Sequence, residues 1–129
     1  MCIRDSVSVV RDYLTDVDRA VSGAGHAKTL IGTAGTVWTM GAIELGVDAS
    51  DGEHIHHSRL THDAAEEIFR TLATEPIEQR KHNPGLEPGR VDVIVGGVIV
   101  VVSVMRHWGF TELLVSEADI LDGLARSIG

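Results

Sequence analysis

A run of 13 apolar or small residues, "VIVGGVIVVVSVM" at 93–105, most restricts how this chain can fold. It is shorter than the roughly 18–20 residues of a membrane-spanning helix, so it belongs in a protein core. Its β-branched residues favour a strand, whereas its continuation to Gly109 behind a Pro-Gly pair favours a helix. We predict one long buried helix over 90–108, in which Gly96 and Gly97 allow a neighbouring element to approach closely.

The other patterns alternate between helix and strand. Helices are expected at 10–21, 37–45, 61–72 and 120–128, and strands at 28–31 and 112–119. Gly46 is the expected C-terminal residue of the second helix, and Thr61 and Asp119 are the expected N-caps of the third and the last. The polar stretch 48–59 and the stretch 76–90, which holds all three prolines, are expected to be connectors. This alternation predicts an α/β domain with a largely parallel sheet.

Length and charge narrow the function classes. The chain has 129 residues, which suffices for one domain or part of a larger one. Its formal net charge of −8 argues against nucleic acid or an anionic membrane as the main partner. The single cysteine, Cys2, excludes a disulfide framework and a thiolate metal site, so we expect a cytoplasmic protein.

The first six residues, "MCIRDS", resemble the translation of a sequencing-library adapter. We therefore expect residues 1–6 to be an artefact and residues 7–129 to be the biological part of a chain truncated at its start.

The stretch "TLIGTAGTVWTM" at 29–40 changes from apolar to glycine-rich and back. It is typical of a strand, a tight turn and a helix. Glycines in such a turn let the backbone approach a ligand, and the first amides of the helix suit an anion, most often phosphate. Packing alone explains such a turn equally well, because it matches neither a Walker loop nor a GxGxxG fingerprint.

Three further groups were weighed for chemistry. The histidines His54, His56, His57 and His62 have metal-ligand spacing, but no aspartate follows at the required offset, so we expect no metal site. Ser116, Glu117 and Asp119 lie where the last strand ends, the place at which open α/β sheets bind ligands, although helix capping also explains them. Arg90 and Asp92 suit a helix cap or a bracing ion pair.

Four stretches together resemble the Ppx/GppA phosphatase family of exopolyphosphatases and guanosine pentaphosphate phosphohydrolases. They are "IGTAGTVWTMGAIELG", "SRLTHDAAEEIFRTLA", "GLEPGRVDVIVGGVIVV" and "ELLVSEADILDGLA", and "PGRVDVIVGG" and "VSEADILDGL" are the most specific parts. The resemblance extends from about residue 9 to the end. It implies an α/β fold: an incomplete ribonuclease-H-like lobe, the second of two, in the actin-like ATPase superfamily of sugar kinases, heat-shock proteins and actin.

The resemblance implies that Gly32, Thr33, Ala34, Gly35 and Thr36 form one wall of a phosphate-binding cleft. The family loop more often has glycine or serine at the position of Ala34, so alanine is a small residue in the same place. The catalytic glutamate, the other phosphate loops and the Mg²⁺-associated carboxylates of the family have no counterpart in this chain and are expected upstream. Mg²⁺ is therefore the expected cofactor of the longer protein, with no ligand in this chain.

In that longer protein, the resemblance implies hydrolysis of a terminal phosphoanhydride of polyphosphate or guanosine pentaphosphate, between which the sequence does not choose. This chain alone is expected to be inactive. The alternatives are a nucleotide-binding lobe of a related kinase or ATPase and a non-catalytic regulatory fragment. The expected partners are the substrate and the N-terminal lobe; a second copy of the chain is a further candidate, and no nucleic acid or membrane partner is expected.

Overall fold

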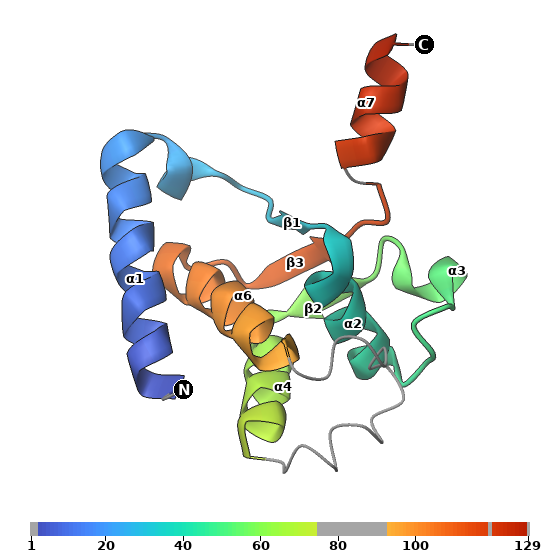
Figure 1. The fold of residues 1–129 in the computed structure, drawn as a ribbon, viewed down its shortest axis with the longest axis horizontal. Coiled ribbons are helices and arrows are strands. Elements are labelled where there is room, and N and C mark those ends of the chain that lie inside the picture. Colours follow the sequence, from blue (N-terminus) through green and yellow to red (C-terminus); the bar gives the residue numbers. More distant parts are fainter. Residues whose placement is uncertain (1–2, 75–92, 119, 129) are drawn as a thin grey trace.

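A small mixed sheet forms the centre of the computed structural model, which describes residues 3–74, 93–118 and 120–128 (Figure 1). Its strands are β1 (Ile31–Gly32), β2 (Arg59–Thr61) and β3 (Glu112–Val115), in the order β1-β3-β2. β1 runs parallel to β3, whereas β2 pairs with β3 antiparallel, with Leu60 opposite Leu113. The α/β class is confirmed, but the expectation of a largely parallel sheet is wrong for one of its two strand pairs.

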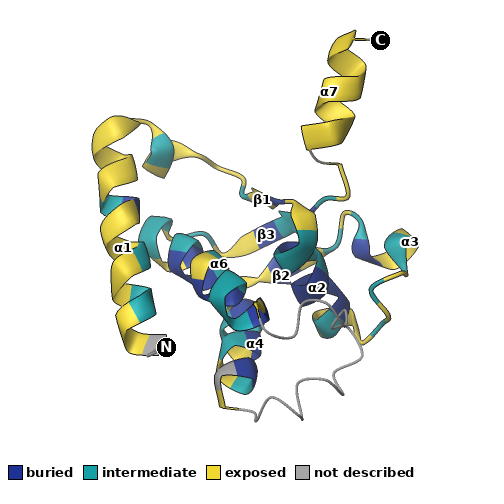
Figure 2. Cartoon of the chain, in the orientation of Figure 1, coloured by how far each residue is buried: buried dark blue, intermediate teal, exposed yellow. Residues whose placement is uncertain are grey.

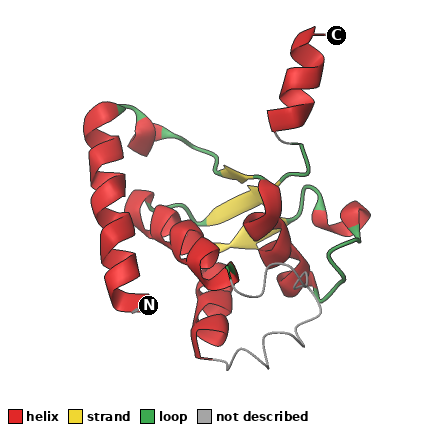
Figure 3. Cartoon of the chain, viewed as in Figure 1, coloured by secondary structure: helices red, strands yellow, loops and turns green. Residues whose placement is uncertain are grey.

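Helices pack beside the sheet, except for the last one, which extends away from it (Figure 3). They are α1 (Ile3–Ala20), the 3-10 helix η1 (Ala24–His26), α2 (Ala34–Leu45), α3 (Gly52–Ile55), α4 (His62–Thr74), α6 (Ile94–Trp108) and α7 (Ile120–Ile128). Within the described ranges, none of them combines the length and the apolar character that crossing a bilayer requires.

The helix α6 is central to the core and packs against α1, α2 and α4 (Figure 2). Val98 and Val102 on this helix are almost inaccessible to solvent. The prediction of a buried helix in the apolar run is therefore confirmed over 94–108; residues 90–92 lie outside the described part. Val100, in contrast, is 47% exposed, so the helix is not buried on every side.

Helix ends follow the expected capping residues. Gly46 has φ 69° and ψ 31° in the left-handed region and ends α2, as its position predicts. Thr61 accepts a hydrogen bond at its hydroxyl from the Ala64 amide and so caps α4. Gly109 ends α6 in the same left-handed conformation as Gly46, with φ 71°.

Several boundaries differ from expectation. β1 begins at Ile31, so the strand expected at 28–31 overlaps it by one residue. The connector at 48–59 contains α3 and the start of β2, a strand that the sequence pattern missed. The connector at 76–90, the pair Arg90 and Asp92, and the cap Asp119 lie outside the described residues.

Helix α7 extends away from the rest of the molecule (Figure 1). The predicted helix at 120–128 is confirmed, but none of its described residues is buried. Ile120 and Ile128 are more than four-fifths exposed. An amphipathic pattern therefore leads here to an apolar face that stays exposed among the described residues.

Candidate functional site

The strand-to-helix corner at the start of α2 is the first element of the site. Gly32 ends β1 and Thr33 is the N-cap of α2. A Cβ built on Gly32 would lie 2.7 Å from both methyl carbons of Val37. Glycine at this position is therefore required for packing of the strand on the helix, the alternative that the sequence left open. The close approach of β1 to α2 at Gly32 therefore packs the core and does not make room for a ligand.

Ala34 has an unusual backbone conformation. Its φ is 69°, in the left-handed region that residues with a Cβ adopt at a cost of about 1–2 kcal/mol. Such strain persists only where the surroundings impose it, and it concentrates at functional sites. Ala34 is exposed and Gly35 half-buried, so this strained turn faces a surface that solvent can reach.

A pocket of about 370 Å³ opens beside this turn. It is lined by Ala34, Gly35, Trp38, Ala49, Ser50, Gly52, Ser116 and Glu117. Three segments far apart in the chain thus meet there: the first turns of α2, the loop before α3 and the end of β3. Of the five residues in the predicted phosphate wall, Ala34 and Gly35 border the pocket.

The remaining three members of the predicted wall do not line the pocket. Thr36 points toward α6, because a Cβ built on Gly97 would lie only 2.3 Å from the Thr36 hydroxyl oxygen. Gly32 packs on Val37, and the hydroxyl of Thr33 makes no capping hydrogen bond to α2. Gly32 and Thr36 therefore position the turn, while Ala34 and Gly35 present its backbone.

The end of β3 supplies the opposite side of the pocket. The Ser116 amide donates to the Gly32 carbonyl at 2.9 Å, which ties the two corners together. The Ser116 hydroxyl accepts from the Ala118 amide at 3.2 Å. The Glu117 amide donates to Nδ1 of His56 at 2.8 Å, an interaction that requires this nitrogen to be unprotonated. The predicted corner at 116–117 thus lies at the pocket.

Sequence reasoning missed the loop that completes the pocket. The Trp38 indole donates to the Ala49 carbonyl at 2.7 Å and holds residues 49–52 against α2. The side chain of Trp38 lies 3.8 Å from a Cβ built on Gly52. A tryptophan whose N–H needs a partner was the available signal; nothing in the sequence around Ala49 and Ser50 indicates a pocket.

The histidines each have a nearby partner. Asp51 lies 2.9 Å from Nδ1 of His54, and this hydrogen bond raises the His54 pKa. The His56 ring lies on that of His57, with 3.6 Å between centroids, and Glu66 lies 3.0 Å from Nε2 of His62. Among the described residues, no three acidic, histidine or cysteine side chains converge as a metal ion requires.

The pocket also does not form a self-contained Mg²⁺ site. Glu117 is the one carboxylate among its described lining residues, accompanied by the hydroxyls of Ser50 and Ser116. Mg²⁺ prefers six oxygen ligands in near-octahedral geometry and uses carboxylates, water and substrate phosphate. This donor set is too small to hold the ion by itself, so no chemistry of this site is derived through a metal.

Known proteins are similar to this chain in sequence and in backbone structure, although no family model matches it. It is 40% identical over 106 residues to Exopolyphosphatase 2 of Mycobacterium tuberculosis, a match that covers 79% of this chain and 33% of that protein. It is 36% identical over 96 residues to a bifunctional 3-dehydroquinate synthase/phosphatase of Fusobacterium nucleatum, covering 74% of this chain and 14% of that protein.

Two solved structures contain the same fold. An exopolyphosphatase-like protein matches with a TM-score of 0.92 at 28% identity, over 98% of this chain and 42% of that one. The Aquifex aeolicus member of the Ppx/GppA family matches with a TM-score of 0.84 at 24% identity, over 98% of this chain and 40% of that one. The chain spans about a third of the length of the curated exopolyphosphatases it matches. The chain belongs to the Ppx/GppA exopolyphosphatase family and is an α/β part of its actin-like ATPase fold.

Proposed function

We propose that this chain forms one wall of the phosphate-binding cleft of a hydrolase that releases terminal phosphate from polyphosphate or guanosine pentaphosphate. The observation that supports this function is the pocket at the first turn of α2. Backbone N–H groups at a helix N-terminus favour oxyanions, and the small residues Ala34 and Gly35 leave space for them. Membership in the exopolyphosphatase family supports the same substrate class.

The five residues of the wall divide into two roles. Ala34 and Gly35, which line the pocket, present their backbone to the phosphate, and Thr33 precedes them as the N-cap of α2. Gly32 and Thr36 hold the turn from behind through Val37 and Gly97. This division explains why glycine at 32 and small residues at 34–35 are required for different physical reasons.

The chain alone is expected to be inactive. Hydrolysis of a phosphoanhydride needs an oriented water molecule, a carboxylate that positions it, and cations or amides around the phosphoryl group. The described pocket supplies one turn of amides and the carboxylate of Glu117, which lies at the proposed anion site and would repel the substrate. We therefore place the catalytic carboxylate and Mg²⁺ on the remainder of the longer protein.

Phosphate release tests this proposal. The purified chain and the full-length Mycobacterium tuberculosis relative should be assayed with polyphosphate and Mg²⁺. We expect turnover by the relative alone. Turnover by the chain at a comparable rate would show that the catalytic groups lie within these residues, contrary to the proposal.

A substitution in the longer protein tests the wall itself. Gly35→Val would place a branched side chain where the anion approaches, so phosphate release should fall by at least about a hundredfold while the protein remains folded. Unchanged turnover would contradict the assignment. Tight binding of a nucleoside triphosphate, with no hydrolysis of polyphosphate, would instead favour the related kinase.

A further inference from the structure

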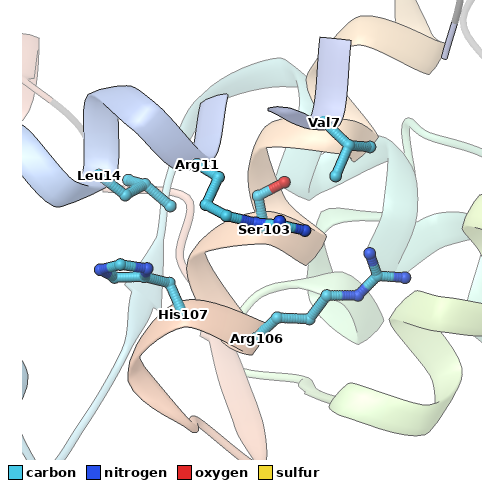
Figure 4. Close-up of a pocket in the computed structure, with 6 residues that line it drawn as sticks. All are labelled: Val7, Arg11, Leu14, Ser103, Arg106 and His107. Atoms are coloured by element: carbon cyan, nitrogen blue, oxygen red, sulfur yellow. The ribbon is translucent and has the colours of Figure 1, made fainter. Parts of the chain in front are cut away.

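A second pocket lies between α1 and α6 and shares no lining residue with the first (Figure 4). Its volume is about 130 Å³, enough for a small ion with water, since one water molecule takes roughly 30 Å³ of the liquid. Its lining residues are Val7, Arg11, Leu14, Ser103, Arg106 and His107. Two are arginines, one is a histidine and none is acidic, so the lining favours an anion.

Ser103 is a buried polar residue at this pocket. Its side chain is 5% exposed, and its hydroxyl has no hydrogen-bond partner in the part of the chain that the structure describes. An unsatisfied buried hydroxyl costs about 1–3 kcal/mol, so such groups normally have a partner. Figure 4 shows the hydroxyl turned toward the space that Arg11 and Val7 also border. A ligand in that space would satisfy it.

Arg11 supplies positive charge that no described side chain neutralises. Arg106 donates to both carboxylate oxygens of Glu66, at 2.6 Å each, and is thereby committed to an ion pair. Nε2 of His107 lies 2.6 Å from a carboxylate oxygen of Asp18. The Arg11 guanidinium, in contrast, has no ion pair or hydrogen bond with any residue in the described ranges.

We propose that this pocket binds a small tetrahedral oxyanion of the phosphate class, held by the Arg11 guanidinium and the Ser103 hydroxyl. A guanidinium donates two parallel hydrogen bonds to such an ion, and the hydroxyl donates a third from the opposite helix. Arg11 is exposed, whereas Ser103 is 5% exposed, so the hydrogen bond from the hydroxyl would form away from bulk water, where such a bond is stronger. The site is independent of the proposed function at α2, because the two pockets have no residue in common.

Titration of the ¹⁵N-labelled 129-residue chain with inorganic phosphate tests the site, with sodium chloride of equal ionic strength as the reference. We expect saturable shifts of the Arg11 and Ser103 amide signals. Arg11→Gln should raise the dissociation constant for phosphate at least tenfold, because the substitution removes the charged donor. Arg126→Gln, an equal change of charge on α7, should leave it unchanged. Equal losses of phosphate affinity in the two variants would overturn the proposal. Shifts of the Arg11 and Ser103 signals that do not saturate with phosphate would also overturn it.

Ser103→Ala separates ligand binding from folding. Loss of an unsatisfied hydroxyl should leave the melting temperature without phosphate unchanged or higher, yet weaken phosphate binding about tenfold. Unchanged binding in this variant would contradict the assignment. Sulfate should compete with phosphate; competition by acetate and not by sulfate would overturn the tetrahedral class. Gly35→Val should leave these shifts intact, so failure of this site and failure of the α2 site are distinguishable.

Discussion

Two apolar helices of this chain have opposite environments. Helix α6 lies among α1, α2 and α4 and buries six of its residues, whereas α7 buries none of its described residues (Figure 2). Both were expected as helices from their apolar residues. Apolar spacing therefore predicts a helix, whereas the neighbouring elements that cover the helix decide its contribution to stability.

The largest expected effect comes from a charge in the buried face of α6. Val102→Asp should destabilise the fold by several kcal/mol or prevent folding, because Val102 is completely buried and the charge would have no partner. Val100→Asp is the matched control on the exposed side of the same helix and should cost less than about 1 kcal/mol. Urea unfolding measures both. Similar losses in the two variants would show that Val100 is also covered in solution.

The adjacent glycines of α6 give the next largest contrast. Gly97→Ala would place a Cβ 2.3 Å from the Thr36 hydroxyl oxygen on α2, which should cost about 1–3 kcal/mol. A Cβ on Gly96 would have no described neighbour within 4 Å, so Gly96→Ala should stabilise the helix by up to about 1 kcal/mol. The melting temperature should fall for Gly97→Ala and rise for Gly96→Ala. Stabilisation by both would mean that α2 and α6 do not touch at this point.

The ion pair between α4 and α6 should have a smaller, pH-dependent effect. Hydrogen bonds from Arg106 lower the pKa of Glu66 below its ordinary value of 4.5. A lowered pKa in the folded state stabilises the protein above pH 4.5, and this contribution is lost as the pH falls through the folded value. Glu66→Gln should therefore cost about 1 kcal/mol near pH 7 and little in strong acid.

The adjacent residue provides its control. Glu67 pairs with Arg70 on the surface of α4, where both side chains are about two-thirds exposed. Glu67→Gln should change the free energy of unfolding by less than about 0.5 kcal/mol at any pH. Denaturant titrations at pH 7 and in strong acid, below the folded pKa of Glu66, test both variants, and a Glu66→Gln cost that persists once Glu66 is protonated in the folded state would contradict the ion-pair explanation.

The smallest effect is expected at the strained turn. Ala34→Gly removes the penalty of a left-handed conformation and should stabilise the chain by roughly 0.5–1 kcal/mol. Ala64→Gly, in the regular helix α4, should destabilise it by about the same amount. Melting temperatures of the two variants should shift in opposite directions. A lower melting temperature for Ala34→Gly would show that residue 34 does not adopt the left-handed conformation.

Sequence patterns predicted most of the described helices, although α3 was expected to be part of a connector and α1 begins at Ile3 rather than near residue 10. Gly46 and Thr61 cap α2 and α4 because their local chemistry suffices, independently of tertiary contacts. The strand β2 was missed because its three residues have too short an alternation to stand out, and the pairing of Leu60 with Leu113 defines it. The sequence could not predict that Val100 is exposed, because a continuous apolar run does not indicate which side of the helix faces solvent.

The site was less predictable than the fold. The spacing of glycines marked the turn at 32–36, and its resemblance to a family loop indicated phosphate. Neither signal could show that Gly32 is needed for Val37 or that Thr36 faces Gly97, because both facts depend on packing between distant segments. The loop at 49–52 joins the pocket through the Trp38 indole, a tertiary contact with no local pattern.

The most direct test of the central claim is a titration of the ¹⁵N-labelled chain with tripolyphosphate. The phosphate wall predicts saturable shifts of the Ala34 and Gly35 amide signals, lost in Gly35→Val and unaffected by Arg11→Gln. Shifts that leave the Ala34 and Gly35 signals unchanged, or that persist in Gly35→Val, would contradict the assignment of the first turn of α2 as a phosphate-binding wall.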